Sequence, residues 1–314
     1  MTDLPELPAL ALDIGGTKIA AGIVDPAGRL VAQQRIETPR GVGLDAEELF
    51  SHLDALVSRV AGDTTFAGVG VGVGGPMSWP DGVVSTLNIP AWRGFPLRER
   101  LAERFGGLPV RLHNDAVCLA VAEHWRGAGR GKSDMLGMVV STGVGGGLVL
   151  GGRLVDGASG NAGHIGHVVV DPSGPDCHCG GVGCLEAIAR GPAIAAWAVA
   201  NGWQSQSGAA RDVADDAGRG HPVARAALER AGRALGIAIA STAHLLDLQV
   251  VVIGGGVAQA GPLLFDPLQA ALHRHVRMEF ARDVAVVPAE LGQNAGLIGA
   301  AALVLAGDDY WSAD

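Results

Sequence analysis

The feature that most constrains this chain is a strand–turn–strand pattern that occurs twice. The first copy, "LALDIGGTKIAAGIVDPAGRLVAQQRI", indicates an apolar strand ending at Asp13, a glycine turn, an alternating strand, a second turn and a third strand. The second copy, "MLGMVVSTGVGGGLVLGGRLVDG", repeats that order. Helical patterns follow the copies near residues 45–60 and 191–200, and a third strand with a glycine turn, "VVVIGGGVAQ", comes late. The duplication predicts two related α/β domains that face each other across a cleft.

Glycine turns at strand ends expose backbone N–H groups that can hold phosphate oxygens. One such turn is weak evidence, because most glycine turns between strands only connect them. Here Asp13 ends the strand, where its carboxylate can hold Mg²⁺ through water, while Gly15, Gly16 and Thr17 approach the phosphates of a nucleotide. The turn of the second copy, residues 142–145, is expected to meet the same phosphates from the opposite wall.

Several other function classes are disfavoured. A net charge of −9 and a pI of about 5.5 argue against a large nucleic-acid surface. The start, "MTDLPELPA", lacks the positive charge and apolar run of a signal peptide, so we expect a cytoplasmic protein without a membrane span. "RGAGRGKS" has Arg126 where a Walker A loop needs glycine, and "GGGVAQAG" lies too near the C-terminus for a dinucleotide fold.

An acid stands where an apolar strand runs into an Ala-rich helix, in "VRLHNDAVCLAVAEHW". Asp115 at this junction has two interpretations. It can cap the helix, a role that Asp and Asn both favour. It can also project into the cleft and take the proton from a sugar hydroxyl that attacks a γ-phosphate, which contributes about 10²–10⁴-fold to such a reaction.

Three of the four cysteines cluster in "GHIGHVVVDPSGPDCHCGGVGCLE". Cys177, Cys179 and Cys184 lie on a glycine-rich loop, and His167 precedes them by ten positions. Three thiolates and one imidazole make a closed tetrahedral site, which zinc takes when it serves structure rather than chemistry. His178 stands between two of these ligands and is expected to be exposed.

In order along nearly the whole chain, "DIGGTK", "GVGGP", "HNDA", "STGVGGG", "GHIGH", "CHCGGVGC" and "VIGGG" resemble the motifs of the ROK family of bacterial sugar kinases and repressors. The resemblance implies an actin-like, hexokinase-like (ribonuclease H-like) α/β fold and transfer of phosphate from ATP, with Mg²⁺, to a sugar 6-hydroxyl. It makes Asp115 the catalytic base and His167, Cys177, Cys179 and Cys184 the ligands of a structural Zn²⁺. The nucleotide and Mg²⁺ would be held by Asp13, Gly15, Gly16, Thr17, Lys18, Thr142, Gly143, Gly145, Gly255 and Gly256. The sugar would be held by Gly75, Asn88, Asn114, His164, His167 and Glu186.

One position departs from the family pattern. Most family kinases have Glu where this chain has His164, and an imidazole can donate as well as accept a hydrogen bond, so the sugar preference is expected to differ. "AGHIGH", "DPSGPDC" and "GCLEAIARG" are most similar to N-acetylmannosamine kinases. A glucokinase, or a kinase for an amino sugar or C7-cyclitol of secondary metabolism, remains the alternative.

The expected organisation is a small N-terminal α/β domain over residues 1–115, onto which a C-terminal helix near 300–314 packs back. A larger α/β domain over residues 116–299 carries the zinc loop. The resemblance also implies a homodimer or homotetramer with a small-molecule sugar as substrate and no nucleic-acid or membrane partner. The rival class is a ROK-type sugar-responsive regulator, which is disfavoured because the "DIGGTK" strand comes too early for a preceding helix-turn-helix domain.

Overall fold

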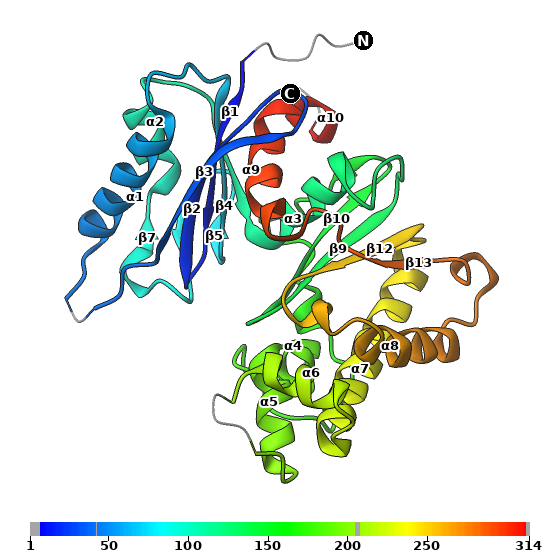
Figure 1. Cartoon of the computed structure of the whole chain (residues 1–314). Helices are drawn as coiled ribbons and strands as arrows, with labels where there is room; N and C mark the ends of the chain where they lie inside the picture. The colour runs from blue at the N-terminus through cyan, green and yellow to red at the C-terminus, as the bar shows by residue number, and fades with distance from the viewer. Residues whose placement is uncertain (1–6, 42, 205–207, 312–314) are drawn as a thin grey trace. The chain divides into compact units, whose positions relative to one another are not determined.

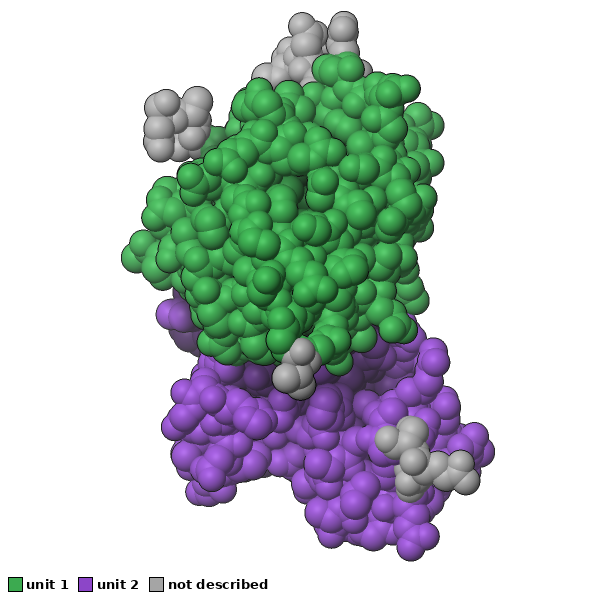
Figure 2. Space-filling view, turned by 90° about the vertical axis from the view of Figure 1, so that its left-hand side faces the viewer, with its two compact units in different colours: residues 1–130, 147–162, 293–314 green, residues 131–146, 163–292 purple. Residues whose placement is uncertain are grey.

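A computed structural model of the chain describes residues 7–41, 43–204 and 208–311. These residues form two compact units, coloured separately in Figure 2. Unit 1 comprises residues 1–130, 147–162 and 293–314, and unit 2 comprises residues 131–146 and 163–292, with the undescribed positions left aside. The chain therefore leaves and re-enters each unit, and its C-terminal helices belong with the N-terminal sheet.

The sheet of unit 1 has five strands in the order β3-β2-β1-β4-β8. β1 (Ala9–Ile14), β2 (Lys18–Val24) and β3 (Leu30–Glu37) pair antiparallel. β4 (Gly68–Val73) and β8 (Val110–Asn114) extend the sheet from β1 in parallel. The carboxyl ends of β1, β4 and β8 therefore lie at the same edge of the sheet.

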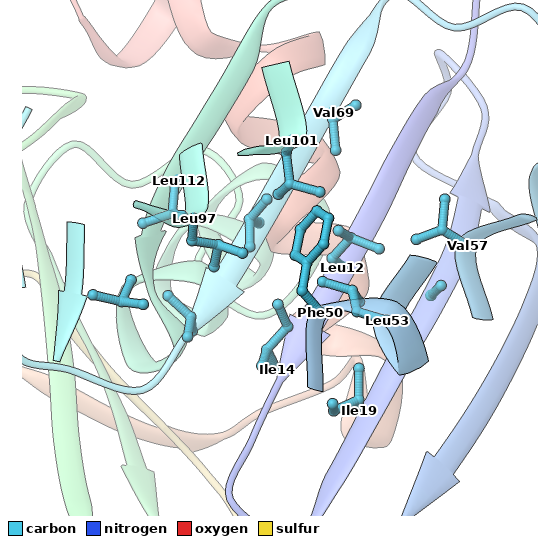
Figure 3. Close-up of a cluster of buried hydrophobic side chains, with 14 of the residues drawn as sticks. Leu12, Ile14, Ile19, Phe50, Leu53, Val57, Val69, Leu97, Leu101 and Leu112 are labelled. Atoms are coloured by element: carbon cyan, nitrogen blue, oxygen red, sulfur yellow. The ribbon is translucent and has the colours of Figure 1, made fainter. Parts of the chain in front are cut away.

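Strand β4 reads "GVGVGV", and its alternation explains how both faces of this sheet are covered. Val69, Val71 and Val73 point into a core built with α1 (Ala46–Ala61) and α2 (Leu97–Arg104), part of which Figure 3 shows. The glycines face the other side, where a Cβ on Gly70 would overlap the backbone of α9 (Ala295–Leu305). α9 also packs on α3 (Asp115–Arg126), so the missing side chains let these helices approach the sheet closely (Figure 1).

The second sheet has the order β11-β10-β9-β12-β13. Its strands are β9 (Met135–Val140), β10 (Val144–Leu150), β11 (Arg153–Leu154), β12 (Val250–Gly254) and β13 (Ala285–Pro288). β12 pairs in parallel with both β9 and β13. The helices of unit 2 are α4 (Leu185–Ala189), α5 (Gly191–Ala200), α6 (Ala210–Gly218), α7 (Pro222–Leu246) and α8 (Pro262–His275).

Smaller elements complete the described chain. A three-stranded sheet joins β5 (Met77–Ser78), β6 (Val83–Ser85) and β7 (Arg93–Phe95), and α10 (Gly307–Tyr310) follows α9. Single 3₁₀ turns occur at Pro90–Trp92, Ile165–His167, Val257–Ala260, Glu279–Ala281 and Gly292–Asn294. Among the described residues, no helix combines the length and apolar character needed to cross a membrane.

Both copies of the predicted strand–turn–strand pattern are confirmed, as are the helices after them. Asp45 caps α1 by accepting a hydrogen bond from the Glu48 amide at 2.7 Å. The division into residues 1–115 and 116–299 stays a prediction. The predicted packing of a C-terminal helix near 300–314 stays a prediction as well. In the structure a helix begins at Ala295, and residues 312–314 lie outside the described residues. Residues 1–6, on which the expectation of a start without a signal peptide partly rests, also lie outside them.

Candidate active site

In unit 1, the carboxyl ends of three parallel strands bring polar groups and glycines together. Register pairing places Asp13 of β1 beside Gly72 of β4, and Val73 of β4 beside Asn114 of β8. Gly75 follows β4 and lies against Asn114, since a Cβ built on Gly75 would lie 3.2 Å from Asn114 Nδ2. Ligand sites of open α/β sheets form at this kind of edge.

Asn114 and Asp115 share the start of α3. The Asn114 side chain is the N-cap and accepts a hydrogen bond from the Ala116 amide at 3.0 Å. Asp115 is the first helical residue, and its Oδ1 accepts from the same amide at 2.8 Å. Asn114 therefore holds the N-cap position, and Asp115 adds a second acceptor for the same amide. Its side chain is exposed at the helix N-terminus.

The carboxyl group of Asp13 sits in an unfavourable electrostatic environment. Burial, followed by the nearby charge of Asp115, raises the pKa of Asp13 to about 6, although Lys18 and Arg35 act in the opposite direction. Asp13 also lies against the first turn of α9, where a Cβ on Gly296 would lie 2.6 Å from Asp13 Oδ2. A divalent cation would relieve the repulsion between the two carboxylates, and their hard oxygen atoms are the donors that Mg²⁺ prefers.

The glycine turn after β1 is held by hydrogen bonds to its carbonyl groups. The Gly15 amide donates to the Lys18 carbonyl at 3.0 Å, and Thr38 Oγ1 donates to the Gly15 carbonyl at 2.6 Å. Arg40 donates from Nε to the Gly16 carbonyl at 3.2 Å and from its terminal nitrogen to Thr17 Oγ1 at 3.4 Å. Sequence reasoning missed Arg40, since its contacts with this turn are 23 and 24 residues distant in sequence.

The corresponding turn of unit 2 lies between β9 and β10. Glu186 Oε2 accepts a hydrogen bond from the Val144 amide at 2.8 Å, so this carboxylate lies directly against the turn. The Gly191 amide, at the start of α5, donates to the Ser141 carbonyl at 2.7 Å. At the end of β12, a Cβ on Gly255 would overlap Val140. Two segments distant in sequence, residues 186–191 and the end of β12, therefore converge on one glycine turn.

The loop that carries His164 and His167 also packs on this turn. Gly166 is close enough to Val144 that a Cβ on Gly166 would overlap its carbonyl group. The His164 and His167 rings are stacked with centroids 6.2 Å apart, and both side chains are exposed. Glu186 and the two histidines are thus neighbours of the same turn within unit 2.

The four predicted zinc ligands, His167, Cys177, Cys179 and Cys184, form one cluster whose ligand atoms all lie within 4.8 Å of one another. The Cys179 and Cys184 sulfur atoms are 3.7 Å apart, and Cys177 Sγ lies 3.8 Å from His167 Nδ1. Tetrahedral Zn²⁺ with Zn–S bonds of about 2.3 Å separates its sulfur ligands by about 3.8 Å. The cysteines are free thiols, because a disulfide would need about 2 Å.

Metal binding at the cluster would be coupled to proton release. Burial, with the neighbouring Cys179 and Cys177, raises the pKa of the Cys184 thiol to about 12, so a bound cation has to displace that proton. His178 lies outside the cluster, as predicted: it is exposed and accepts a hydrogen bond from Arg190 at 2.7 Å. The donor set and its spacing therefore fit zinc.

The structure gathers the predicted site residues into one group in each unit. In unit 1 these are Asp13, Gly15, Gly16, Thr17, Lys18, Gly75, Asn88, Asn114 and Asp115, with Asn88 packed on Gly16. In unit 2 these are Thr142, Gly143, Gly145, His164, His167, Glu186, Gly255 and Gly256, with the three cysteines of the candidate metal cluster on the adjoining loop. The catalytic and binding roles assigned to them remain predictions.

Two glycine turns, each at the end of a buried β-strand, and a pair of acidic residues beside one of them define an α/β protein of the actin-like, hexokinase-like class. The chain belongs to the ROK family, which matches residues 9–306. It is 32% identical over 315 residues to a glucokinase from Thermotoga maritima, covering 96% of this chain and 98% of the relative.

Two further comparisons agree with this assignment. An N-acetylmannosamine kinase from Yersinia pseudotuberculosis is 36% identical over 295 residues, covering 93% of this chain and 96% of the relative. A solved ROK family glucokinase from Streptomyces griseus, in complex with glucose and AMPPNP, matches with a TM-score of 0.80 at 33% identity, covering 94% of this chain and 98% of that one. The predicted family and fold class are confirmed.

Proposed function

We propose that this protein is an ATP-dependent sugar kinase that transfers the γ-phosphate to the 6-hydroxyl of a hexose or N-acetylhexosamine. The observation that carries the proposal is the Asp115 carboxylate, exposed at the start of α3 and close enough to Asp13 to raise its pKa. The relatives named glucokinase and N-acetylmannosamine kinase, and the structure that contains AMPPNP, support ATP as the phosphate donor.

Asp115 acts as the general base in this proposal. Its carboxylate accepts the proton of the sugar hydroxyl while the hydroxyl oxygen attacks the γ-phosphorus and ADP leaves. Asp13 would hold Mg²⁺, which neutralises charge on the phosphates when it is bound. The turn residues Gly15, Gly16, Thr17 and Lys18 contribute backbone and side-chain donors to the phosphates, as do the residues of the 142–145 turn and Gly255–Gly256.

Asn114, Asn88 and Gly75 in unit 1, and His164, His167 and Glu186 in unit 2, are proposed to hold the sugar. His167 has two roles that are compatible. Its Nδ1 faces Cys177 and would bind Zn²⁺, which leaves Nε2–H as a donor to a sugar hydroxyl. The structural zinc would fix the loop between residues 163 and 186 and thereby the positions of these hydroxyl partners.

N-acetylmannosamine is the acceptor we favour, because "AGHIGH", "DPSGPDC" and "GCLEAIARG" are most similar to N-acetylmannosamine kinases and His164 replaces the glutamate that most family kinases carry. Glucose is the alternative that the glucokinase relatives support, and an amino sugar or C7-cyclitol is a further one. The homodimer or homotetramer that the family implies stays a prediction.

The test is an ADP-release assay with MgATP on glucose, mannose, N-acetylglucosamine, N-acetylmannosamine and kanosamine. Asp115→Asn is expected to lower kcat by about 10²–10⁴-fold on the best acceptor, while the KM values for sugar and ATP change little. Asp63→Asn, at an exposed position of unit 1, serves as the matched control and should behave as wild type. Full turnover by Asp115→Asn, or no turnover of any acceptor by the wild type, would contradict the proposal.

A further inference from the structure

A buried histidine precedes the proposed base by two positions. His113 is 0% exposed, at the end of β8. Its Nδ1 accepts a hydrogen bond from the Asn114 amide at 2.8 Å, and its Nε2 lies 3.0 Å from Asp156 Oδ1. Because Nδ1 accepts, the single proton of the neutral ring is on Nε2 and is donated to Asp156. The sugar-kinase roles discussed above do not use either side chain.

The second oxygen of Asp156 is also engaged. The indole Nε1–H of Trp311 donates to Asp156 Oδ2 at 2.7 Å, so each carboxylate oxygen accepts one N–H donor. The Trp79 ring packs against both His113 and Trp311, with centroid distances of 5.0 and 6.3 Å. Gly160 packs so closely against Trp79 that a Cβ on Gly160 would overlap the Trp79 side chain. Hydrogen bonds thus link Trp311, through Asp156 and His113, to the Asn114 backbone.

Asp156 determines which tautomer His113 adopts. A carboxylate only accepts, so it requires the proton on Nε2 and leaves Nδ1 free to accept from the Asn114 amide. With the proton on Nδ1 instead, two donors would face each other, and the Asn114 peptide would have to rotate. That peptide connects β8 to the residue that caps α3 and to Asp115 itself. A small displacement there moves the proposed base and the proposed sugar ligand together.

We propose that His113 and Asp156 are positioning residues for sugar phosphorylation, and that Trp311 completes their hydrogen bonding. This inference rests on the proposed function, because it acts through Asn114 and Asp115. A purely structural role would instead join the 147–162 segment and the C-terminal segment to the sheet. The two roles differ in what a substitution changes. If the residues position the site, the variant loses sugar turnover even at a temperature where it is fully folded. If their role is purely structural, the fully folded variant keeps its turnover.

The kinetic test compares three variants and a control on the best sugar acceptor. Asp156→Asn replaces one acceptor oxygen by an NH₂ donor, which must face either His113 or Trp311. We expect kcat for the sugar to fall about 10- to 100-fold and its KM to rise, while the KM for ATP stays within about twofold. Trp311→Phe removes one donor and keeps an aromatic side chain, so its effect should be smaller, about fivefold.

The double variant Asp156→Asn with Trp311→Phe gives the sharpest result. Without the indole N–H, the asparagine can turn its oxygen toward His113 and its NH₂ away, so much of the lost turnover should return. Tyr310→Phe is the matched control. It removes a neighbouring hydrogen bond from the same C-terminal segment to a half-buried histidine, between Tyr310 Oη and His124 Nδ1 at 2.8 Å. It should leave both KM values and kcat unchanged.

A spectroscopic readout tests the arrangement without turnover. In the ¹⁵N spectrum of the wild type, His113 should carry its proton on Nε2, and Asp156→Asn should populate the other tautomer and speed hydrogen exchange of the Asn114 amide. Three kinetic outcomes would overturn the inference, even if Asp115→Asn is inactive. They are wild-type kinetics in Asp156→Asn, a loss of kcat in the double variant equal to the product of the losses in the single variants, and a loss of kcat in Tyr310→Phe equal to that in Asp156→Asn. If the wild type phosphorylates no sugar, the proposed function fails, and an unchanged tautomer in Asp156→Asn would overturn the positioning separately.

Discussion

Replacing Asp13 by asparagine is expected to stabilise the metal-free protein while abolishing its proposed activity. Burial and the nearby Asp115 charge raise the pKa of Asp13 from its ordinary value of 3.8 to about 6. Each pH unit of such a difference corresponds to about 1.4 kcal/mol, so the ionised carboxylate costs up to about 3 kcal/mol at pH 8. Asparagine has nearly the same shape and no charge, so Asp13→Asn should recover most of that free energy.

The sign of the pH dependence follows from proton binding. Between about pH 4 and 6 the folded protein holds a proton on Asp13 that the unfolded chain releases, so the free energy of unfolding falls as pH rises through this interval. The advantage of Asp13→Asn over the wild type should therefore be largest at pH 8 and about half as large at pH 5, and it should disappear below about pH 4.

Thermal unfolding of both proteins in magnesium-free buffer measures this difference. For a chain of this length, 3 kcal/mol corresponds to a rise in Tm of about 5 °C at pH 8, and about half that at pH 5. Asp63→Asn, at an exposed position, should not move Tm. A variant at Asp13 that melts at or below the wild-type temperature at pH 8, or a gain that does not depend on pH, would refute the electrostatic reasoning.

Three further outcomes are expected. Cys179→Ser should lose its bound zinc, as measured by elemental analysis, and should have a lower kcat/KM for the sugar. Wild-type kinetics in the zinc-free variant would contradict the proposed role of the cluster. Gly299→Ala should cost about 3 kcal/mol by urea unfolding, since its Cβ would overlap the Cys118 backbone, whereas Gly218→Ala meets no atoms and should be tolerated. His164→Glu should raise the kcat/KM ratio of glucose to N-acetylmannosamine at least about tenfold, and an unchanged ratio would remove His164 from sugar selection.

Much of the candidate site follows from local signals. Glycine turns after apolar strands identified Gly15, Gly16 and Gly143, and the spacing of three cysteines with His167 predicted the zinc cluster. The Asn114-Asp115 pair marked a strand-to-helix junction, although only the structure shows that Asn114 supplies the cap. These signals are readable because turns, caps and metal loops are made by residues a few positions apart.

Other residues of the site gave no such signal. Arg40 reaches the Gly16 carbonyl from 24 residues away, Asp156 reaches His113 across 43, and Trp311 reaches Asp156 across 155. Gly296 is in α9, where the chain returns to unit 1, and it could not be paired with Asp13 from spacing.

The sequence by itself determined the two repeated strand–turn–strand units, the ends of their helices and the residues of the candidate metal cluster, because backbone sterics and short-range hydrogen bonds act within a few residues. The tertiary structure decided which distant side chains meet: the helix α9 that lies against Asp13, and the Asp156–His113 pair behind Asn114. Such meetings depend on how glycine-lined strands and helices pack, and packing is a property of the whole folded unit rather than of any stretch of chain.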